Sequence, residues 1–343
     1  MARLDTEIPM LRTSERQGFK RCRQRFWWGS VEGLRSPQTR AALDFGTIIH
    51  ECMEKFYIPG RKRGPKPVVT FRRLIKEHGD FNMNEYDEND NKTRRSAAEL
   101  GESMMLTYYE KYGADEDIAI IAPEFPFRIR LTDAGGKDFW YVGRFDALGL
   151  WLPTDSPFIF EHKTGSEQLK SMLWGDEQTS SYWAFAPQYI AALQRNKMLR
   201  RFKGLELEMM LFNFMGKRMP DERPMNSEGL RLNKNGTVSK RQPKEQFERI
   251  PAYRDEDDRK SVIKRIKQEM YEIRLVREGK LPVYKNFTKD CSWDCQFRDM
   301  CELHETRSDW RSYRNQMYVE SDGYAEYAHD LGFKSPMEFM EVK

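Results

Sequence analysis

Residues 141–165, YVGRFDALGLWLPTDSPFIFEHKTG, contain two largely apolar segments, as expected of two buried strands. The apolar runs are joined by a turn rich in Pro, Asp and Ser, so the segment predicts a hairpin. Side chains alternate along a strand, which places Glu161 and Lys163 on one face and His162 on the other. If the strands pair, Asp146 lies beside them. Two carboxylates and an ammonium group could then hold a divalent cation and orient an attacking water.

The rest of the pattern predicts helices around this sheet. Residues 12–28 predict a short helix capped by Thr13 or Ser14, and Asp44 is predicted to cap a helix over 45–57. Further along we expect a polar helical region to about residue 112, a strand over 124–131, helical structure over 167–200, a buried strand over 205–214 and a charged helix over 255–278. This order indicates an α/β core with helical additions, followed by an aromatic-rich segment, 305–343.

Composition sets only broad limits on function. The chain has 343 residues, 39% of them hydrophobic, which suits a substantial core in one large domain or two small ones. The net charge is +4 and the pI is about 8.6, below the roughly 9 of a dedicated nucleic-acid-binding domain. No apolar run approaches the roughly 20 residues of a membrane span, and the N-terminus lacks a signal-peptide core, so we expect a cytoplasmic protein.

Basic residues gather in three places. The clusters are Arg61, Lys62, Arg63 and Lys66; Lys92, Arg94 and Arg95; and Arg231, Lys234, Lys240 and Arg241. The first and third lie in loops rich in Gly, Pro and Asn, where basic side chains could follow a phosphate backbone. A solvated loop is the plainer interpretation of each cluster.

Other residues could complete the site on the hairpin. Gln178 and Tyr182 are four apart, so a helix places them on one face, and His50 follows Gly46 by one helical turn. Glu124 begins the strand that precedes Asp146. Each feature also has a structural interpretation: a surface ion pair for the hairpin charges, a helix histidine for His50, and helix packing for Gln178 and Tyr182.

Taken in order, GTIIH, EFPF, GRFDAL, EHKTG and QTSSY resemble the motifs of the RecB-like branch of the PD-(D/E)xK nucleases. That branch includes the nuclease domains of RecB and AddB and the CRISPR-associated exonucleases related to them. The resemblance covers about residues 12–302. It implies a restriction-endonuclease-like fold, a mixed central sheet flanked by helices, in a nuclease domain spanning 1–304, with 305–343 as an extension of unknown role.

The resemblance also implies roles for the candidate residues. His50, Asp146, Glu161 and the backbone carbonyl of His162 would hold Mg²⁺ or Mn²⁺. Lys163 would activate the attacking water or stabilise charge on the phosphate. Gln178 and Tyr182 would orient the lysine or the DNA, and Glu124 matches an acidic position of less settled role. An imidazole ligand raises the relative affinity for Mn²⁺, so we expect activity with both ions and often more with Mn²⁺.

The chain has five cysteines, three of them in the run CSWDCQFRDMC at 291–301. Clustered cysteines in a cytoplasmic chain favour a metal site over disulfides. Cys22, Cys291, Cys295 and Cys301 resemble the ligands of the iron–sulfur cluster of AddB and related exonucleases, which implies a 4Fe–4S cluster joining the two ends of the domain. A zinc site made of the last three cysteines and His304 is the alternative. Cys52 is expected to be a core residue.

These features together predict a metal-dependent DNase. The expected activity is exonucleolytic, on single-stranded or resected DNA ends. It would serve recombination, repair, phage DNA processing or CRISPR adaptation in a bacterial or phage-infected cell. Proteins of recombination, replication or CRISPR adaptation are possible partners. The alternatives are a structure-specific endonuclease, a partner-dependent processing subunit and a catalytically silent DNA-binding module with a structural metal. Five aromatic residues could stack on unpaired bases or pack in the core: Trp140, Tyr141, Trp174, Tyr182 and Trp183.

Overall fold

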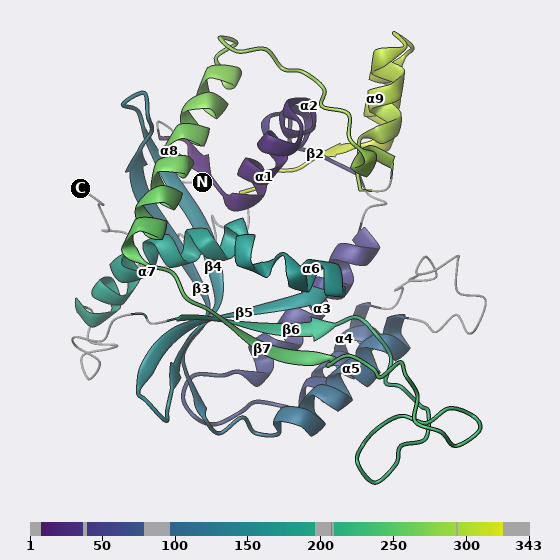
Figure 1. Cartoon of the computed structure of the whole chain (residues 1–343). Coiled ribbons are helices and arrows are strands. Elements are labelled where there is room, and N and C mark those ends of the chain that lie inside the picture. Colours follow the sequence, from purple (N-terminus) through teal and green to yellow (C-terminus); the bar gives the residue numbers. More distant parts are fainter. Residues whose placement is uncertain are drawn as a thin grey trace.

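A mixed six-stranded sheet forms the centre of the molecule (Figure 1). The computed structural model describes residues 8–36, 40–78, 97–195, 207, 209–292 and 294–324. The strands of the sheet are β1 Met10–Leu11, β3 Ile118–Thr132, β4 Asp138–Trp151, β5 Ser156–Gly165, β6 Met209–Gly216 and β7 Phe247–Ala252. Their order is β1-β4-β5-β6-β7, and β3 pairs with the other edge of β4. The predicted α/β fold with a mixed sheet between helices is confirmed.

Strand direction changes across the sheet. The pairs β3–β4, β4–β5 and β6–β7 are antiparallel, whereas β1–β4 and β5–β6 are parallel. β1 pairs with the beginning of β4, at Trp140 and Tyr141, and β5 pairs with its end, from Ala147 to Trp151. Among the described strands, the middle of β4 therefore has no partner on that side.

Three helices cover one face of the sheet, α3 Arg40–Phe56, α4 Pro67–His78 and α5 Ala97–Tyr112 (Figure 1). The predicted apolar stripe of α3 is confirmed, because Ile49, Met53 and Phe56 are all buried. They pack with Phe158 and Phe160 of β5, which point to this face, and with Cys52, the expected core cysteine. This layer fixes α3 against the end of β5.

The opposite face is covered by α1 Thr13–Arg21, α2 Arg23–Phe26, α7 Glu177–Arg195 and α8 Glu256–Arg277. A buried polar contact crosses this layer: Arg16 of α1 donates to Glu269 of α8 at 2.5 Å and to Ser181 of α7 at 2.9 Å. Short helical turns complete the set: the π-helical turn η1 Trp27–Val31, α6 Glu167–Ser171 and η2 Leu173–Gly175. α7 and α8 thus pack on the sheet and hold α1 in place.

The C-terminal elements pack on the N-terminal segment. They are η4 Lys289–Ser292, α9 Arg298–Glu305, α10 Trp310–Met317 and β8 Val319–Glu320, which pairs with β2 Leu34–Arg35. Trp28, Phe297 and Tyr318 share a small separate core in this region. The described part of the predicted extension, up to residue 324, therefore packs on the body of the protein.

Several predicted boundaries were wrong for local reasons. Asp44 lies inside α3, which begins at Arg40, and does not cap it. The cap of α1 is Arg12, and the helix begins at Thr13. β3 begins six residues before Glu124, because the apolar run IAIIA extends the strand. Residues 196–206 and 208 lie outside the described part of the chain. No described helix combines the length and apolar character of a membrane span.

Candidate active site

The site lies where the sheet forks. The ladder between β4 and β5 ends at the pair Ala147 and Phe160, one residue before Asp146 and Glu161. Beyond this point β4 continues along β3, and β5 continues along β6. Asp146 Oδ2 accepts a hydrogen bond from the backbone N–H of His162 at 2.6 Å, so a side chain replaces the missing ladder bond. The fork thereby brings together the two predicted carboxylates.

Glu161 begins a chain of hydrogen bonds that ends on α7. Lys163 Nζ donates to Glu161 Oε1 at 2.9 Å and to Gln178 Oε1 at 3.1 Å, and Gln178 Nε2 donates to the Tyr182 hydroxyl at 2.8 Å. The predicted pairing of Gln178 with Tyr182 on one helical face is confirmed by this contact. The lysine ammonium is therefore fixed from two sides.

Glu161 is fully buried, and its second oxygen, Oε2, has no hydrogen-bond partner among the residues that the structure describes. Burial and the neighbouring Asp146 carboxylate raise the pKa of Glu161 to about 8. Burial alone would lower the pKa of Lys163, but the Glu161 carboxylate outweighs it and raises that pKa. Such a buried oxygen could be paired by a bound cation.

His50 and Glu124 approach Asp146 from other elements. His50 Nδ1 of α3 lies 3.4 Å from Asp146 Oδ1. The ligand atoms of His50, Glu124 and Asp146 all lie within 4.8 Å of one another, so these three could hold a metal ion. Burial alone would lower the pKa of His50, but Asp146 raises it to about 9, and burial with Asp146 raises the pKa of Glu124 to about 7.

Glu124 adopts a strained backbone conformation. Its φ is +42°, in the left-handed region that non-glycine residues rarely occupy. Pro123 and Phe125 pair with Ala147 and Phe145, which places Glu124 across from Asp146. Such strain costs about 1–3 kcal/mol and collects at functional sites. The geometry thus brings Glu124, a secondary candidate from the sequence, close to Asp146 and His50.

His162 points to the other face of the sheet, as predicted. It is buried, and its Nδ1 lies 2.9 Å from Asn213 Nδ2. Arg249 Nε of β7 donates to Asn213 Oδ1 at 3.0 Å, and Arg249 Nη2 pairs with Asp115 at 2.6 Å. Tyr57 stacks on the imidazole at 5.6 Å between ring centroids. This cluster lies on the face of the sheet to which His162 points, and it supports the backbone segment that holds Asp146.

The residues of this supporting cluster were not predicted from the sequence. Asn213 gave a usable signal, since it is a polar residue inside the apolar run LFNF. Arg249 gave none, because FERIPA is short, charged and contains a proline. Asp176 was also missed, although an Asp before the helix of Gln178 is a recognisable cap signal. Its Oδ1 accepts from the Thr179 N–H at 2.7 Å, and its charge acts on Lys163.

A family model described as PD-(D/E)XK nuclease superfamily matches residues 13–302. The chain belongs to the PD-(D/E)XK nuclease superfamily. Membership implies a metal-dependent nuclease acting on DNA. No curated protein matches the sequence. Among solved structures, the crystal structure of a candidate exonuclease from Eubacterium rectale is similar. The two sequences are 11% identical, the match covers 82% of this chain and 86% of that chain, and the TM-score is 0.39.

The residues present fit the divalent metal of PD-(D/E)XK nucleases. Carboxylate oxygens are the ligands that Mg²⁺ prefers, and an imidazole suits Mn²⁺ as well. Asp146 and Glu124 supply oxygens beside His50, whereas Glu161, a predicted ligand, is not in this group of three. The Glu161 carboxyl interacts electrostatically with Asp146 and His50. The donor set is hard and predominantly anionic, as a magnesium site requires.

The four predicted cluster cysteines line one cavity of about 480 Å³, which we call the cysteine pocket. Backbone N–H groups of Asn286 and Thr288 lie 3.4 Å from the sulfurs of Cys22 and Cys291. His304 is not among the lining residues of the pocket, and its ring packs near Trp28 and Trp310 instead. Among the residues that the structure describes, no three ligand atoms of the zinc alternative lie within 4.8 Å of one another.

The five aromatic candidates differ in how far their side chains are exposed. Tyr141, Tyr182 and Trp183 are buried in the core and present no face to a nucleotide. The guanidinium of Arg128 lies 4.5 Å from the ring centroid of Trp140, which is partly buried. Trp174 is different: its side chain is 74% exposed in η2, two residues before Asp176.

Proposed function

We propose that this nuclease is a divalent-metal-dependent exonuclease that hydrolyses phosphodiester bonds at single-stranded or resected DNA ends. The observation that carries the proposal is the buried, unpartnered oxygen of Glu161 beside an ammonium group fixed by two hydrogen bonds. Buried carboxylate oxygens in native proteins usually have a hydrogen-bond partner, so an unpartnered one beside a second carboxylate supports a cation site.

Each residue would have a distinct task. Asp146, Glu161, His50 and the His162 carbonyl would hold Mg²⁺ or Mn²⁺, with Glu124 as a further oxygen donor. When bound, the ion would polarise the phosphoryl oxygen and lower the pKa of a bound water.

Lys163 stays protonated, because its pKa is raised, so it would orient the water or stabilise phosphate charge as a hydrogen-bond donor. Gln178 fixes the direction of this ammonium, and Tyr182 fixes the Gln178 amide. A protonated lysine cannot itself accept the proton of the attacking water. The proton must therefore leave through a carboxylate or solvent.

Trp174 supports the single-stranded preference. An exposed indole next to the beginning of α7 offers a flat apolar face on which an unpaired base can stack. Arg254 donates to the Trp174 backbone carbonyl at 2.6 Å and steadies the turn. A base-paired duplex would offer the indole no free base face except at its end.

The test is cleavage of 5′- and 3′-labelled single-stranded and duplex DNA with Mg²⁺ or Mn²⁺, before and after EDTA. Asp146→Asn and Lys163→Gln should each abolish detectable cleavage, and Lys76→Gln, on the exposed side of α4, is the matched control. Stepwise shortening of one labelled strand is expected. Internal cuts at junctions would favour an endonuclease, and absence of cleavage by the wild type would refute the enzymatic proposal.

We further propose that the nuclease belongs to the RecB-like branch and that residues 1–304 form one nuclease domain closed by a 4Fe–4S cluster on Cys22, Cys291, Cys295 and Cys301. The lining and contacts of the cysteine pocket support this choice. All four sulfur-bearing residues line it, and N–H groups directed at two of the sulfurs suit an iron–sulfur cluster. His304, the fourth ligand of the zinc alternative, does not line the pocket.

Anaerobic purification followed by metal analysis tests the cluster. We expect about four irons per chain and a brown colour. Cys295→Ala should lower thermal stability, because a cluster on these ligands closes a loop of most of the chain, whereas Cys52→Ala should retain the iron. One stoichiometric zinc in a colourless protein would overturn the assignment.

A further inference from the structure

A long arm without helices leaves the sheet beside the candidate active site. The arm comprises residues 217–246, between β6 and β7, and extends away from the sheet (Figure 1). The Lys217 N–H donates to the Gly165 carbonyl at 3.0 Å, so the arm begins two residues beyond Lys163 in the strand register. That separation is about 7 Å along a strand.

The arm is folded. Bridges join Met225 to Arg231 and Leu232 to Val238, and tight turns with glycines of positive φ close both loops. A connection of this length in a compact domain is uncommon unless it has a function, because ordering it costs conformational entropy.

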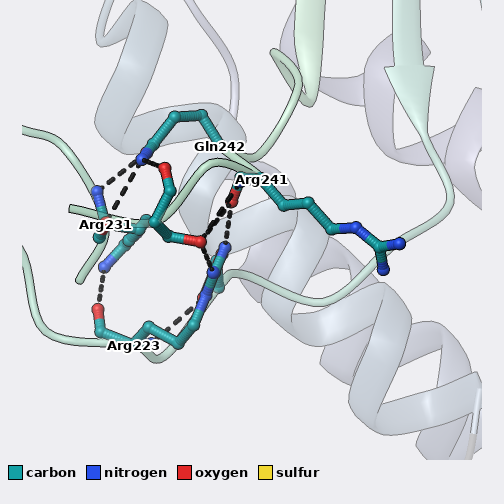
Figure 2. A network of polar contacts seen from close by, with 6 residues as sticks. Arg223, Arg231, Arg241 and Gln242 are labelled. Atoms are coloured by element: carbon teal, nitrogen blue, oxygen red, sulfur yellow. Dashed lines mark hydrogen bonds and ion pairs between the residues drawn. The ribbon is translucent and has the colours of Figure 1, made fainter. Parts of the chain in front are cut away.

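A polar network holds the arm together from inside (Figure 2). Arg223 binds Asp221, donates to Ser239 Oγ at 2.8 Å and donates to the Arg241 carbonyl at 2.8 Å. Gln242 bridges the backbone of Arg231, accepting from its N–H at 2.8 Å and donating to its carbonyl at 3.2 Å. Arg223 and the Asp221 carboxylate therefore stabilise the fold of the arm.

The cations left outside the network face solvent. Lys234, Lys240 and Arg241 are exposed, and the Arg241 guanidinium points away from the network (Figure 2). The arm carries eight basic and four acidic residues, an excess equal to the net charge of +4 of the whole chain. Asp221 pairs with Arg223, and Glu245 pairs with Lys111.

The other described basic loop behaves differently. Arg63 donates to the carbonyls of Asp115 and Ile118, both at 2.7 Å, and its guanidinium lies over the ring of Tyr57. That arginine fastens its loop to the core. Residues 92–95, the remaining basic cluster, lie outside the described part of the chain. Arg61, Lys62 and Lys66 of that loop are exposed, as the arm cations are. The two loops therefore differ in how they are held, the first by the core and the arm by its own polar network.

We propose that the arm binds the phosphate backbone of the DNA strand several nucleotides from the scissile bond. This deepens the proposed function and rests on it. The inner network fixes the shape of the arm, and Lys234, Lys240 and Arg241 supply the charge. A strand held at the site and on the arm would be retained over a longer length than the site alone can hold.

The test is DNA binding without metal, measured by fluorescence anisotropy in EDTA with labelled single strands of about 30 and about 6 nucleotides. Typical single-strand sites cover roughly 4–16 nucleotides, so the long strand can reach beyond one site and the short strand cannot. The arm variant is Lys234→Gln, Lys240→Gln, Arg241→Gln. Its matched control, Lys260→Gln, Lys264→Gln, Arg265→Gln, removes the same charges from the exposed side of α8. Circular dichroism melting should show that both variants fold.

The arm variant should bind the long strand about 10–100-fold more weakly, and its salt slope should fall by about two, since each single-strand phosphate contact contributes about 0.7. The short strand and the α8 control should change less than about twofold in the same assay. Gln242→Ala should weaken binding of the long strand without changing its salt slope. Equal losses in the arm and control variants, or none in either, would overturn the proposal.

The readout separates this inference from the proposed function. If the wild type binds DNA through the arm but never cleaves it, the nuclease proposal fails and the arm stands. If the wild type cleaves and the arm variant binds both strands normally, the arm fails alone. If the wild type binds no DNA in EDTA, the arm is refuted, and cleavage with metal decides the nuclease proposal separately.

Discussion

Arg249→Met should cost both stability and turnover. The Arg249 side chain is 16% exposed and pairs at 2.6 Å with Asp115, whose side chain is 10% exposed. Methionine keeps much of the apolar stem and removes every donor. The substitution leaves the Asp115 carboxylate buried without its cation and leaves Asn213 Oδ1 without its Arg249 donor.

The loss of stability can be estimated from this environment. Removing one partner of a buried ion pair costs about 3–5 kcal/mol. With an unfolding entropy of about 2.1 cal/mol/K per residue, 343 residues give about 0.7 kcal/mol/K, so Tm should fall by about 4–7 °C. Asp115→Asn added to Arg249→Met should recover part of the loss, because the uncompensated charge disappears.

Turnover should fall through His162. Asn213 contacts the imidazole, and the backbone of His162 holds Asp146, so a loosened Asn213 should lower kcat while KM for DNA is unchanged. Thermal melting and steady-state cleavage measure the two effects, with Arg249→Lys as the variant that keeps charge but not the forked contacts. Wild-type Tm would refute the burial argument, and lower Tm with unchanged kcat would refute the positioning argument.

Three further predictions concern other parts of the molecule. Metal affinity should rise with pH up to about 9. The pKa of Glu161 is about 8 and that of His50 about 9, so both groups are protonated at lower pH and must release protons to bind a cation. Calorimetry in buffers of different ionisation enthalpy should show this proton release at pH 7, and a pH-independent affinity would contradict it. Trp174→Ala should weaken single-strand binding by about 1–3 kcal/mol in anisotropy measurements, whereas equal loss with blunt duplex would exclude stacking. Arg16→Met should lower the free energy of unfolding by about 3–5 kcal/mol in urea titration, and Glu269→Leu in the same chain should restore part of it.

The hairpin could be predicted because its information is local. Alternation of side chains and a turn between two apolar runs suffice to place Glu161, Lys163 and His162 on their correct faces. Gln178 and Tyr182 were predictable as a pair for the same reason, since helical periodicity alone brings residues four apart together. The charged helix over 255–278 also matches α8, which ends one residue earlier.

What the sequence could not supply is long-range pairing. Arg249, Asp115 and Asn213 come from three separate segments, and no periodicity connects them. The closeness of Glu124 to His50 depends on the Glu124 φ of +42°, which the sequence EFPF does not predict. Asp44 was assigned as a cap because capping propensity is local, whereas α3 begins four residues earlier, at Arg40.

The fork in the sheet has a consequence for the order in which the site assembles. β4 and β5 are separated by four residues, whereas 43 residues separate β5 from β6 and about a hundred separate His50 from Asp146. Short loops close at lower entropic cost, so we expect the hairpin to form first. Asp146 and Glu161 then meet while His50 is still distant, and Lys163, carried on the same strand, is the cation that lets two repelling carboxylates approach during folding.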